Sequence, residues 1–146
     1  MAKVIFDTNV LVDTFDENRP DHKTSKASIQ LLLASDSSPC LAATSLKDLY
    51  YVLSRSLGEP DARAIIEIVS TVMTVLPVDE NCCHHALSSS EPDFEDGIIR
   101  AAAEIAHADY LVTRDAQAFI GSTVPKISPT DLLRELTHKR KDAGRP

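Results

Sequence analysis

The pattern of apolar and polar residues along the chain predicts short strands that alternate with helices. Strands are expected at about 3–7, 40–44, 75–78, 110–113 and 124–127, where short apolar runs lie between turn-forming residues. Helices are expected at about 8–15, 21–35, 45–57, 59–73, 79–88, 93–108 and 129–139, where apolar residues recur at helical spacing. This alternation indicates an α/β protein with a parallel five-stranded sheet and right-handed crossovers.

Length and composition favour a single domain. The chain has 146 residues, of which 43% are hydrophobic, so residues 1–138 are expected to share one core. Residues 139–146 are basic and are expected to form a disordered tail. The three cysteines are odd in number and two are adjacent, which favours a reducing cytoplasm over a disulfide framework. Asp7 interrupts the N-terminal apolar run and no run approaches about 20 residues, so neither a signal peptide nor a membrane span is expected.

The charge distribution restricts how the protein could bind a polyanion. The net charge is −7, but the last nine residues hold four of the 15 basic residues and one of the 22 acidic ones. The remaining 11 basic and 21 acidic residues give the body a net charge of −10. Such a body repels nucleic acid unless metal ions or a local basic patch intervene.

Asp7 is the first candidate for a functional residue. It directly follows the apolar run Val4–Phe6, where an unpaired buried charge would be costly. It is therefore expected at the end of the first strand, facing water, a partner or a metal. In open α/β sheets, ligands bind beyond the carboxyl ends of the strands.

Other carboxylates are predicted at the same edge of the sheet. Asp48 lies early in the helix after the second strand, Asp93 and Asp96 open the helix before the fourth, and Asp115 follows the fourth. Each has a structural explanation when taken alone: Ser45 and Asp48 fit a capping box, Asp93 an N-cap with Asp96 at N3, and Asp115 a turn residue. Taken together they would repel one another, and a divalent cation would relieve that repulsion. An all-oxygen set of ligands favours Mg²⁺ or Mn²⁺, whose chemistry suits phosphodiester hydrolysis.

Three motifs resemble those of PIN-domain nucleases, in particular the bacterial VapC-type toxins. They are Asp7-Thr8-Asn9-Val10-Leu11, Asp93-Phe94-Glu95-Asp96 and Leu111-Val112-Thr113-Arg114-Asp115, and the similarity runs from Val4 to about Leu133. The resemblance implies a three-layer α/β/α sandwich, and a metal-dependent endoribonuclease that is the toxin of a type II toxin–antitoxin pair.

The resemblance also implies roles for individual residues. Asp7, Asp96 and Asp115 would bind Mg²⁺ or Mn²⁺, and Asp48, where most relatives have Glu, would act directly or through a water. Asp93 is a second-tier ligand. Asn9 and Thr113 would support Asp7 and Asp115, and Arg100 and Arg114 are weaker candidates for contacting phosphate.

The expected partners are RNA, a second copy of the chain and a small antitoxin, without a membrane. The helical pair between Ser45 and Met73 is where protein partners would pack, and the apolar stripe from Ile65 to Met73 fits either an interface or the core. Arg100 could instead pair with Asp96 or Glu104 on its own helix.

Alternatives to a nuclease remain open at this point. One is a phosphatase or receiver-like protein with Asp7 as phosphate acceptor, although Asn9 stands where a phosphatase normally has a second Asp. Another is a non-catalytic PIN-fold module that binds RNA or protein. The run Cys82-Cys83-His84-His85 has the composition of a zinc site, but neighbouring helical residues point about 100° apart and cannot converge on one ion. Cys83 and Leu87 are expected to face the core instead.

Overall fold

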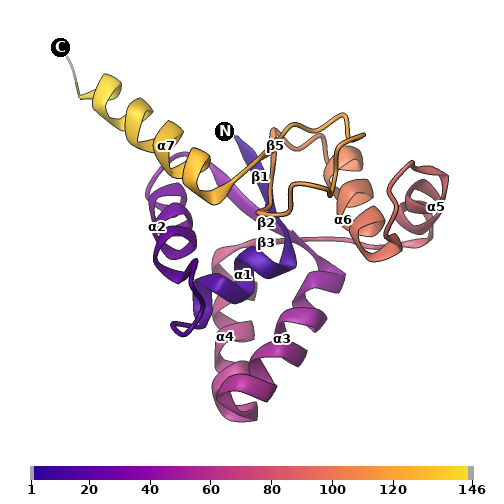
Figure 1. The fold of residues 1–146 in the computed structure, drawn as a ribbon, viewed down its shortest axis with the longest axis horizontal. Helices are drawn as coiled ribbons and strands as arrows, with labels where there is room; N and C mark the ends of the chain where they lie inside the picture. Colours follow the sequence, from indigo (N-terminus) through magenta and orange to yellow (C-terminus); the bar gives the residue numbers. More distant parts are fainter. Residues whose placement is uncertain (1, 145–146) are drawn as a thin grey trace.

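Three buried apolar residues, Val4, Ile5 and Phe6, form most of strand β1 (Lys3–Phe6), the central strand of the sheet. The computed structural model describes residues 2–144. The other strands are β2 (Ser38–Ala42), β3 (Thr74–Leu76), β4 (Tyr110–Val112) and β5 (Lys126–Ile127). Their order is β3-β2-β1-β4-β5 and each pairing is parallel, so the expected α/β fold with a parallel five-stranded sheet is confirmed (Figure 1).

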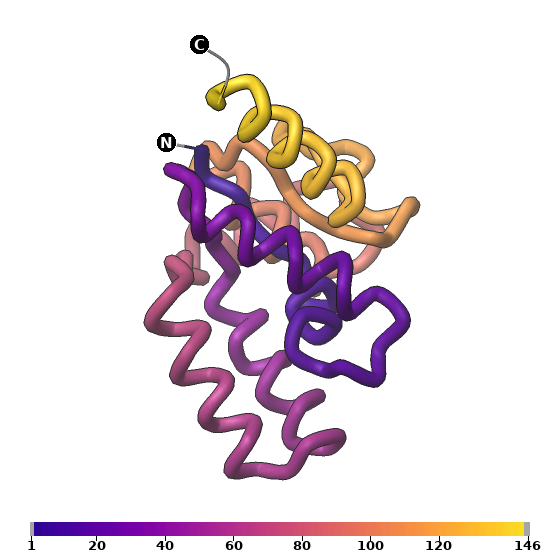
Figure 2. The backbone as a smooth tube through the Cα atoms, turned by 90° about the vertical axis from the view of Figure 1, so that its left-hand side faces the viewer, coloured from indigo at the N-terminus to yellow at the C-terminus, as the bar shows by residue number. Residues whose placement is uncertain are grey.

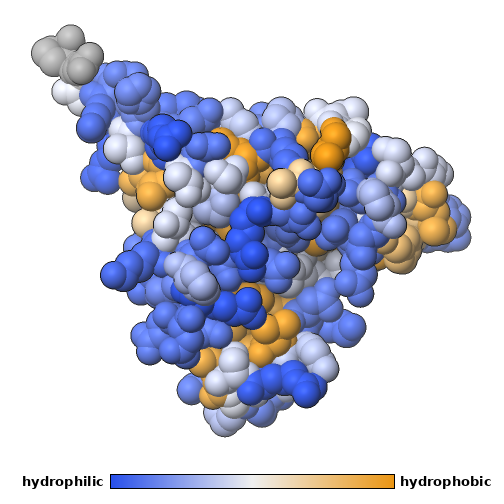
Figure 3. Space-filling model, in the orientation of Figure 1, coloured by the Kyte–Doolittle hydropathy of each residue, from blue (hydrophilic) through white to orange (hydrophobic). Residues whose placement is uncertain are grey.

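Helices cover both faces of this sheet, and the face of the molecule in Figure 3 is mostly hydrophilic with a few separate apolar patches. They are α1 (Thr8–Phe15), α2 (His22–Leu33), α3 (Ala43–Leu57), α4 (Glu59–Val72), α5 (Glu80–Ser88), α6 (Phe94–Ile105) and α7 (Pro129–Ala143). Alternate residues of a strand point to opposite faces, so β1 contributes to two cores. Val4 and Phe6 belong to the core that α1, α2, α3, α4 and α7 complete, whereas Ile5 belongs to the core beneath α5 and α6. Helices therefore lie on both sides of the sheet, as the three-layer interpretation requires.

Helices α3 and α4 pack against each other and extend away from the carboxyl end of the sheet (Figures 1 and 2). Gly58 joins them with a φ of 91°, a conformation that glycine adopts without strain. On the far side of the molecule, α7 packs along α2 (Figure 2). Among residues 2–144, no helix combines the length and apolar character that a membrane crossing requires.

The structure corrects three local predictions. Helix α3 begins at Ala43, directly after β2, with the extended Ala42 at its N-cap, so the predicted capping box of Ser45 and Asp48 is wrong. Helix α7 continues to Ala143, so the tail predicted as disordered from residue 139 is helical up to there, and residues 145–146 lie outside the described part. On α5 the residues that face the core are Cys82 and Ala86, because the helix starts at Glu80 and turns Leu87 outward.

Candidate active site

The carboxylate of Asp7 lies at the end of β1, where it is almost fully buried. Its Oδ1 accepts a hydrogen bond from the Thr8 backbone N–H at 2.8 Å and so caps α1, which begins at Thr8. Its Oδ2 accepts a hydrogen bond from the Thr113 hydroxyl at 2.9 Å. Both carboxylate oxygens are thereby held in one orientation at the edge of the sheet.

Thr113 connects the first and third motifs. Its hydroxyl donates to Asp7 and also accepts a hydrogen bond from the Asp115 backbone N–H at 3.1 Å. Thr113 follows β4, which pairs with β1 so that Val112 stands opposite Phe6. The sequence predicted a supporting role for Thr113 and Asn9. In the structure Thr113 and Thr8 donate to the Asp7 carboxylate, whereas Asn9 is exposed beside it.

A cleft of about 690 Å³ opens between α3 and α6 at this edge of the sheet. Four of the predicted site residues line it: Asp7, Asn9, Asp48 and Asp96. Asp115 lies outside this lining, on the exposed segment after β4. Asp93 caps α6 by accepting a hydrogen bond from the Asp96 backbone N–H at 3.0 Å, as the sequence predicted.

The carboxylates influence one another electrostatically. Burial raises the pKa of Asp7 and outweighs the hydrogen bonds from Thr113 and Thr8, and the nearby charge of Asp115 raises it further. Burial also raises the pKa of Asp96 to about 6, with further contributions from the charges of Asp7, Asp93, Glu91 and Asp115. The charge of Asp115 therefore opposes the ionisation of Asp7, and the charges of Asp7 and Asp115 oppose that of Asp96.

This repulsion predicts that Asp96→Asn will stabilise the metal-free protein. Because the folded-state pKa of Asp96 is about 6 and its unfolded value is near 3.8, the folded protein binds more protons between these values and loses stability as pH rises. A neutral side chain removes that loss, so Asp96→Asn should raise the free energy of unfolding in EDTA at pH 7.5 by about 1 kcal/mol, allowing for solvent screening. Thermal unfolding at several pH values measures the difference, which should vanish near pH 4. Equal midpoints for wild type and variant at pH 7.5 would contradict this.

The segment that carries Asp115 has neither helix nor strand between β4 and β5, and side chains of other elements hold its backbone. The Lys126 ammonium donates to the carbonyl oxygens of Asp115, Ala116 and Ala118 at 2.9, 3.1 and 2.6 Å. The sequence did not indicate this role for Lys126, because the atoms that it binds are backbone oxygens, which every residue has. We expect Lys126→Met to loosen this segment and to lower affinity for Mn²⁺, measured by titration, with Lys139→Met on α7 as the control.

Arg100 holds the far end of the same segment and is buried. Its guanidinium pairs with Glu91 and Glu104, both at 3.3 Å, and donates to the Gly121 carbonyl oxygen at 2.7 Å. A Cβ on Gly121 would come within 3.1 Å of Arg100 Nη1 and 2.6 Å of Ser90 Oγ, so a larger residue there would displace the Ser90 hydroxyl and crowd the guanidinium. Arg100 therefore forms the ion pair with Glu104 that the sequence offered as an alternative role. Its guanidinium is not available to a substrate phosphate.

Arg114 remains partly exposed beside the site. Its Nε donates to Asp13 at 2.7 Å, and Asp13 is itself fully buried on α1. The hydrogen bond with Asp13 raises the pKa of Arg114, and the positive charge in turn lowers that of Asp7. The ion pair fastens the third motif to α1 while leaving part of the guanidinium open to solvent.

The donor set fits Mg²⁺ or Mn²⁺ in its chemistry. All the candidate ligands are carboxylates, which such hard cations prefer, and their mutual repulsion is what a cation would relieve. As the side chains stand, residues 2–144 contain no group of three or more His, Cys, Asp or Glu that could hold a metal ion. Mg²⁺ usually keeps several waters and binds one or two carboxylates directly, so some of these side chains could reach the ion through water.

Sequence comparison assigns the chain to a family. The family model described as PIN domain matches residues 3–117, a range that includes Asp7, Asp48, Asp96 and Asp115. The chain belongs to the PIN domain family. The predicted resemblance is thus confirmed.

Individual relatives of this PIN domain protein are bacterial. It is 33% identical over 91 residues to Ribonuclease VapC1 of Aquifex aeolicus (strain VF5). The match spans 62% of this chain and 62% of the relative, which is less than two thirds of the relative's length. Its fold is similar to Mycobacterium tuberculosis VapC20, described as a Sarcin-Ricin loop cleaving toxin, with 20% identity, a TM-score of 0.65 and coverage of 77% of this chain and 90% of that one. It is also similar to a toxin–antitoxin complex from Klebsiella pneumoniae, with 19% identity, a TM-score of 0.66 and coverage of 86% and 97%.

Proposed function

We propose that this PIN domain protein is a Mg²⁺- or Mn²⁺-dependent endoribonuclease and the toxin of a type II toxin–antitoxin pair. The observation that supports this most directly is the placement of Asp7, Asp96 and Asp115 at the carboxyl edge of the sheet, where the charges of Asp7 and Asp115 raise the pKa of Asp96 and that of Asp115 raises the pKa of Asp7. The similarity to Ribonuclease VapC1 supports RNA as the substrate. The three free cysteines suit a reducing cytoplasm.

Each residue of the site has a task in this proposal. Asp7, Asp96 and Asp115 hold the metal, which when bound activates a water and stabilises the leaving oxygen of the phosphodiester. Asp48 on α3 faces the same cleft and orients the attacking water, and Asp93 is a second-tier ligand that also fixes the start of α6.

Thr113 orients Asp7 and the backbone of Asp115, Asn9 offers an exposed polar side chain to the cleft, and Arg114 offers its exposed side to the phosphate. Arg100, which was also considered for that contact, instead maintains the segment after β4. The nuclease requires no covalent bond to Asp7, and each of its carboxylate oxygens accepts one hydrogen bond and keeps a lone pair for a metal ion. The phosphatase alternative is disfavoured by Asn9, which stands where such an enzyme normally has a second Asp.

Cleavage of RNA by the purified protein tests the proposal. A 5′-labelled single-stranded RNA should be cut in Mn²⁺ or Mg²⁺, EDTA should stop the reaction and added Mn²⁺ should restore it, with 5′-phosphate and 3′-hydroxyl ends. An Asp7→Asn protein purified in parallel measures any contaminating nuclease. Cleavage that persists in EDTA, or cyclic phosphate ends, would overturn the metal mechanism, and normal growth after induction in cells would overturn the toxin role.

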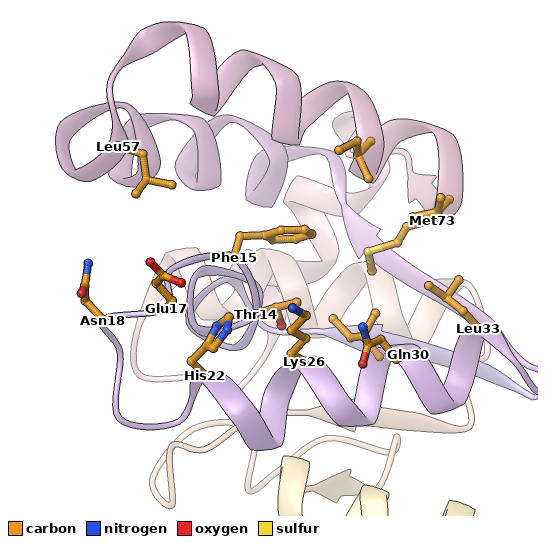
Figure 4. Close-up of a pocket in the computed structure, with 13 residues that line it drawn as sticks. Thr14, Phe15, Glu17, Asn18, His22, Lys26, Gln30, Leu33, Leu57 and Met73 are labelled. Carbon is orange, nitrogen blue, oxygen red and sulfur yellow. The ribbon is translucent and has the colours of Figure 1, made fainter.

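We further propose that an apolar groove beside α4 receives the antitoxin. A groove of about 580 Å³ lies between α2 and the α3–α4 pair, with Phe15 of α1 pointing between them and Leu33, Leu57 and Met73 on its walls (Figure 4). The predicted apolar stripe from Ile65 to Met73 serves both the core and this groove. Val69 and Met73 are buried, whereas Ile68 and Val72 are exposed in the groove. The similar structure from Klebsiella pneumoniae is described as a toxin–antitoxin complex, which supports a small protein as the occupant.

A charge placed in this groove tests the partner. Ile68 is 53% exposed, so Ile68→Asp should leave the fold and RNA cleavage unchanged. It should prevent neutralisation by an antitoxin expressed from the same operon, which growth of cells that produce both proteins measures. Leu87→Asp, on α5, is the control, because Leu87 is 68% exposed on the opposite side of the sheet. If Ile68→Asp instead separates a homodimer, which the family resemblance predicts, the groove is the surface between two copies of the chain.

A further inference from the structure

Helix α3 presents a basic and aromatic stripe beside the acidic cleft. Lys47, Tyr51 and Arg55 follow one another at four-residue spacing, so they lie on one side of the helix. Lys47 and Tyr51 line the cleft together with Asp7 and Asp48. The stripe is about 12 Å long, given the rise of a helix, which leaves room for more than one nucleotide.

Tyr51 and Arg55 are already arranged as a pair. The tyrosine side chain is 57% exposed, and the Arg55 guanidinium carbon lies 5.2 Å from the centre of its ring. Arg55 Nη1 also donates to the Tyr51 hydroxyl at 2.7 Å. The guanidinium therefore holds the ring in place without burying it, which leaves an ordered aromatic surface open to solvent.

A second exposed aromatic ring stands across the cleft. Phe94 is the first residue of α6, between the N-cap Asp93 and the candidate ligand Asp96, and it is 48% exposed. The Asp93 carboxylate caps the first turn of this helix, and Phe94 is not among the residues of either hydrophobic core cluster. Tyr51 and Phe94 thus line the same cleft from opposite walls.

Charge decides what kind of ligand this arrangement suits. The body of the protein carries a net charge of −10, so besides bound metal ions a local run of positive charge would help a polyanionic substrate to reach the carboxylates. Lys47 is the cation among the residues that line the cleft. Within residues 2–144 its one ion pair is a contact of 3.8 Å with Asp48. Cations that alternate with exposed aromatic rings match the alternating phosphates and bases of a single strand.

We propose that Lys47, Tyr51 and Arg55, with Phe94 opposite, form a track that binds unpaired RNA on either side of the scissile phosphate. Lys47 and Arg55 contact phosphates, while Tyr51 and Phe94 stack on splayed bases. Bases of a continuous duplex are already stacked on their neighbours, so the track selects single strands and loops over paired RNA. This inference rests on the ribonuclease function proposed above and names the residues that position the substrate in the same site.

Binding measurements on the inactive Asp7→Asn protein in Mg²⁺ test the track. The fluorescence anisotropy of a labelled single-stranded RNA should show that Tyr51→Ala weakens binding about 10-fold, whereas Tyr51→Phe retains most of it. Tyr51→Leu, which keeps apolar area but not a π face, should resemble Tyr51→Ala. Lys47→Gln should reduce the slope of log affinity against log salt by about one unit. In the active protein, Tyr51→Ala should raise KM for RNA and change kcat little.

Exposed apolar residues elsewhere provide the control. Leu87→Ala on α5 removes a comparably exposed side chain far from the cleft and should leave RNA affinity unchanged. If wild-type protein cleaves RNA but Tyr51→Ala and Phe94→Ala affect neither KM nor affinity, the track is wrong and the nuclease stands. If wild type neither binds nor cleaves RNA, both proposals fail. A change in oligomeric state without a change in RNA affinity would show that a second copy covers these rings, and would overturn the track.

Discussion

Asp7→Asn is expected to lower RNA cleavage at least about 10³-fold while leaving the fold intact. The substitution keeps the shape of the side chain, and its amide oxygen can still accept the Thr8 N–H, so α1 keeps a good N-cap. It removes the negative charge that a metal ion needs at the centre of the site. Burial raises the pKa of Asp7, so a neutral residue should not lower the stability of the metal-free protein.

Three measurements distinguish a chemical defect from a folding defect. Cleavage rates in Mn²⁺ report the chemistry, thermal unfolding in EDTA reports stability, and the shift of the unfolding midpoint on adding Mn²⁺ reports metal binding. Wild type should be stabilised by Mn²⁺ and Asp7→Asn much less so. Asp36→Asn is the matched control, because Asp36 is exposed before β2, at the opposite end of the strands. Unchanged cleavage by Asp7→Asn would remove the central carboxylate from the mechanism, and the exposed Asp115→Asn provides a second variant if Asp7→Asn proves insoluble.

Arg100→Leu is expected to lower the free energy of unfolding at pH 7.5 by about 3–5 kcal/mol. The change leaves the carboxylates of Glu91 and Glu104 buried without their shared cation. Burial works to raise the pKa of Glu104, but hydrogen bonds from the Thr123 backbone, His85 and the Thr123 side chain, together with the charge of Arg100, hold it below its ordinary value. A depressed pKa contributes stability above the unfolded value and loses it as pH falls.

The loss caused by Arg100→Leu should therefore shrink as pH falls, because the unpaired carboxylates can then bind protons. Urea unfolding at pH 7.5 and pH 5 measures this difference. Arg63→Leu provides the control, since its pair with Glu59 is largely exposed on α4 and should be worth less than about 1 kcal/mol. A loss as small as that of Arg63→Leu would show that the buried network contributes little to stability.

The sequence predicted the parts of this protein that depend on local pattern. Strand β1 and the cap at Asp93 follow from an apolar run and from a short polar side chain before a helix, and both are present. The carboxyl-edge position of Asp7 follows from the same reasoning, because an isolated charge ends a buried strand. These features depend on residues that are neighbours in the chain.

Features that depend on tertiary contacts were not predictable in this way. Ser45 has the sequence signature of an N-cap, yet it lies within α3 and receives a hydrogen bond from the Thr8 hydroxyl at 2.9 Å. Arg100 lies near the expected edge of the sheet, but only the approach of the 119–123 backbone shows that its guanidinium is used there. Whether Asp115 faces the cleft also depends on how a segment without regular structure returns to the sheet.

The three hydrogen bonds from Lys126 hold the backbone of the segment after β4, whichever side chains that segment carries. Since the ammonium binds backbone oxygens, it places no demand on the exposed side chains of Ala116 and Gln117. Substitutions at these two positions can accumulate, or be introduced by design, without altering the path of the chain that places Asp115. The turn beside the site is thus a place where new surface contacts can evolve while the backbone around Asp115 keeps its path.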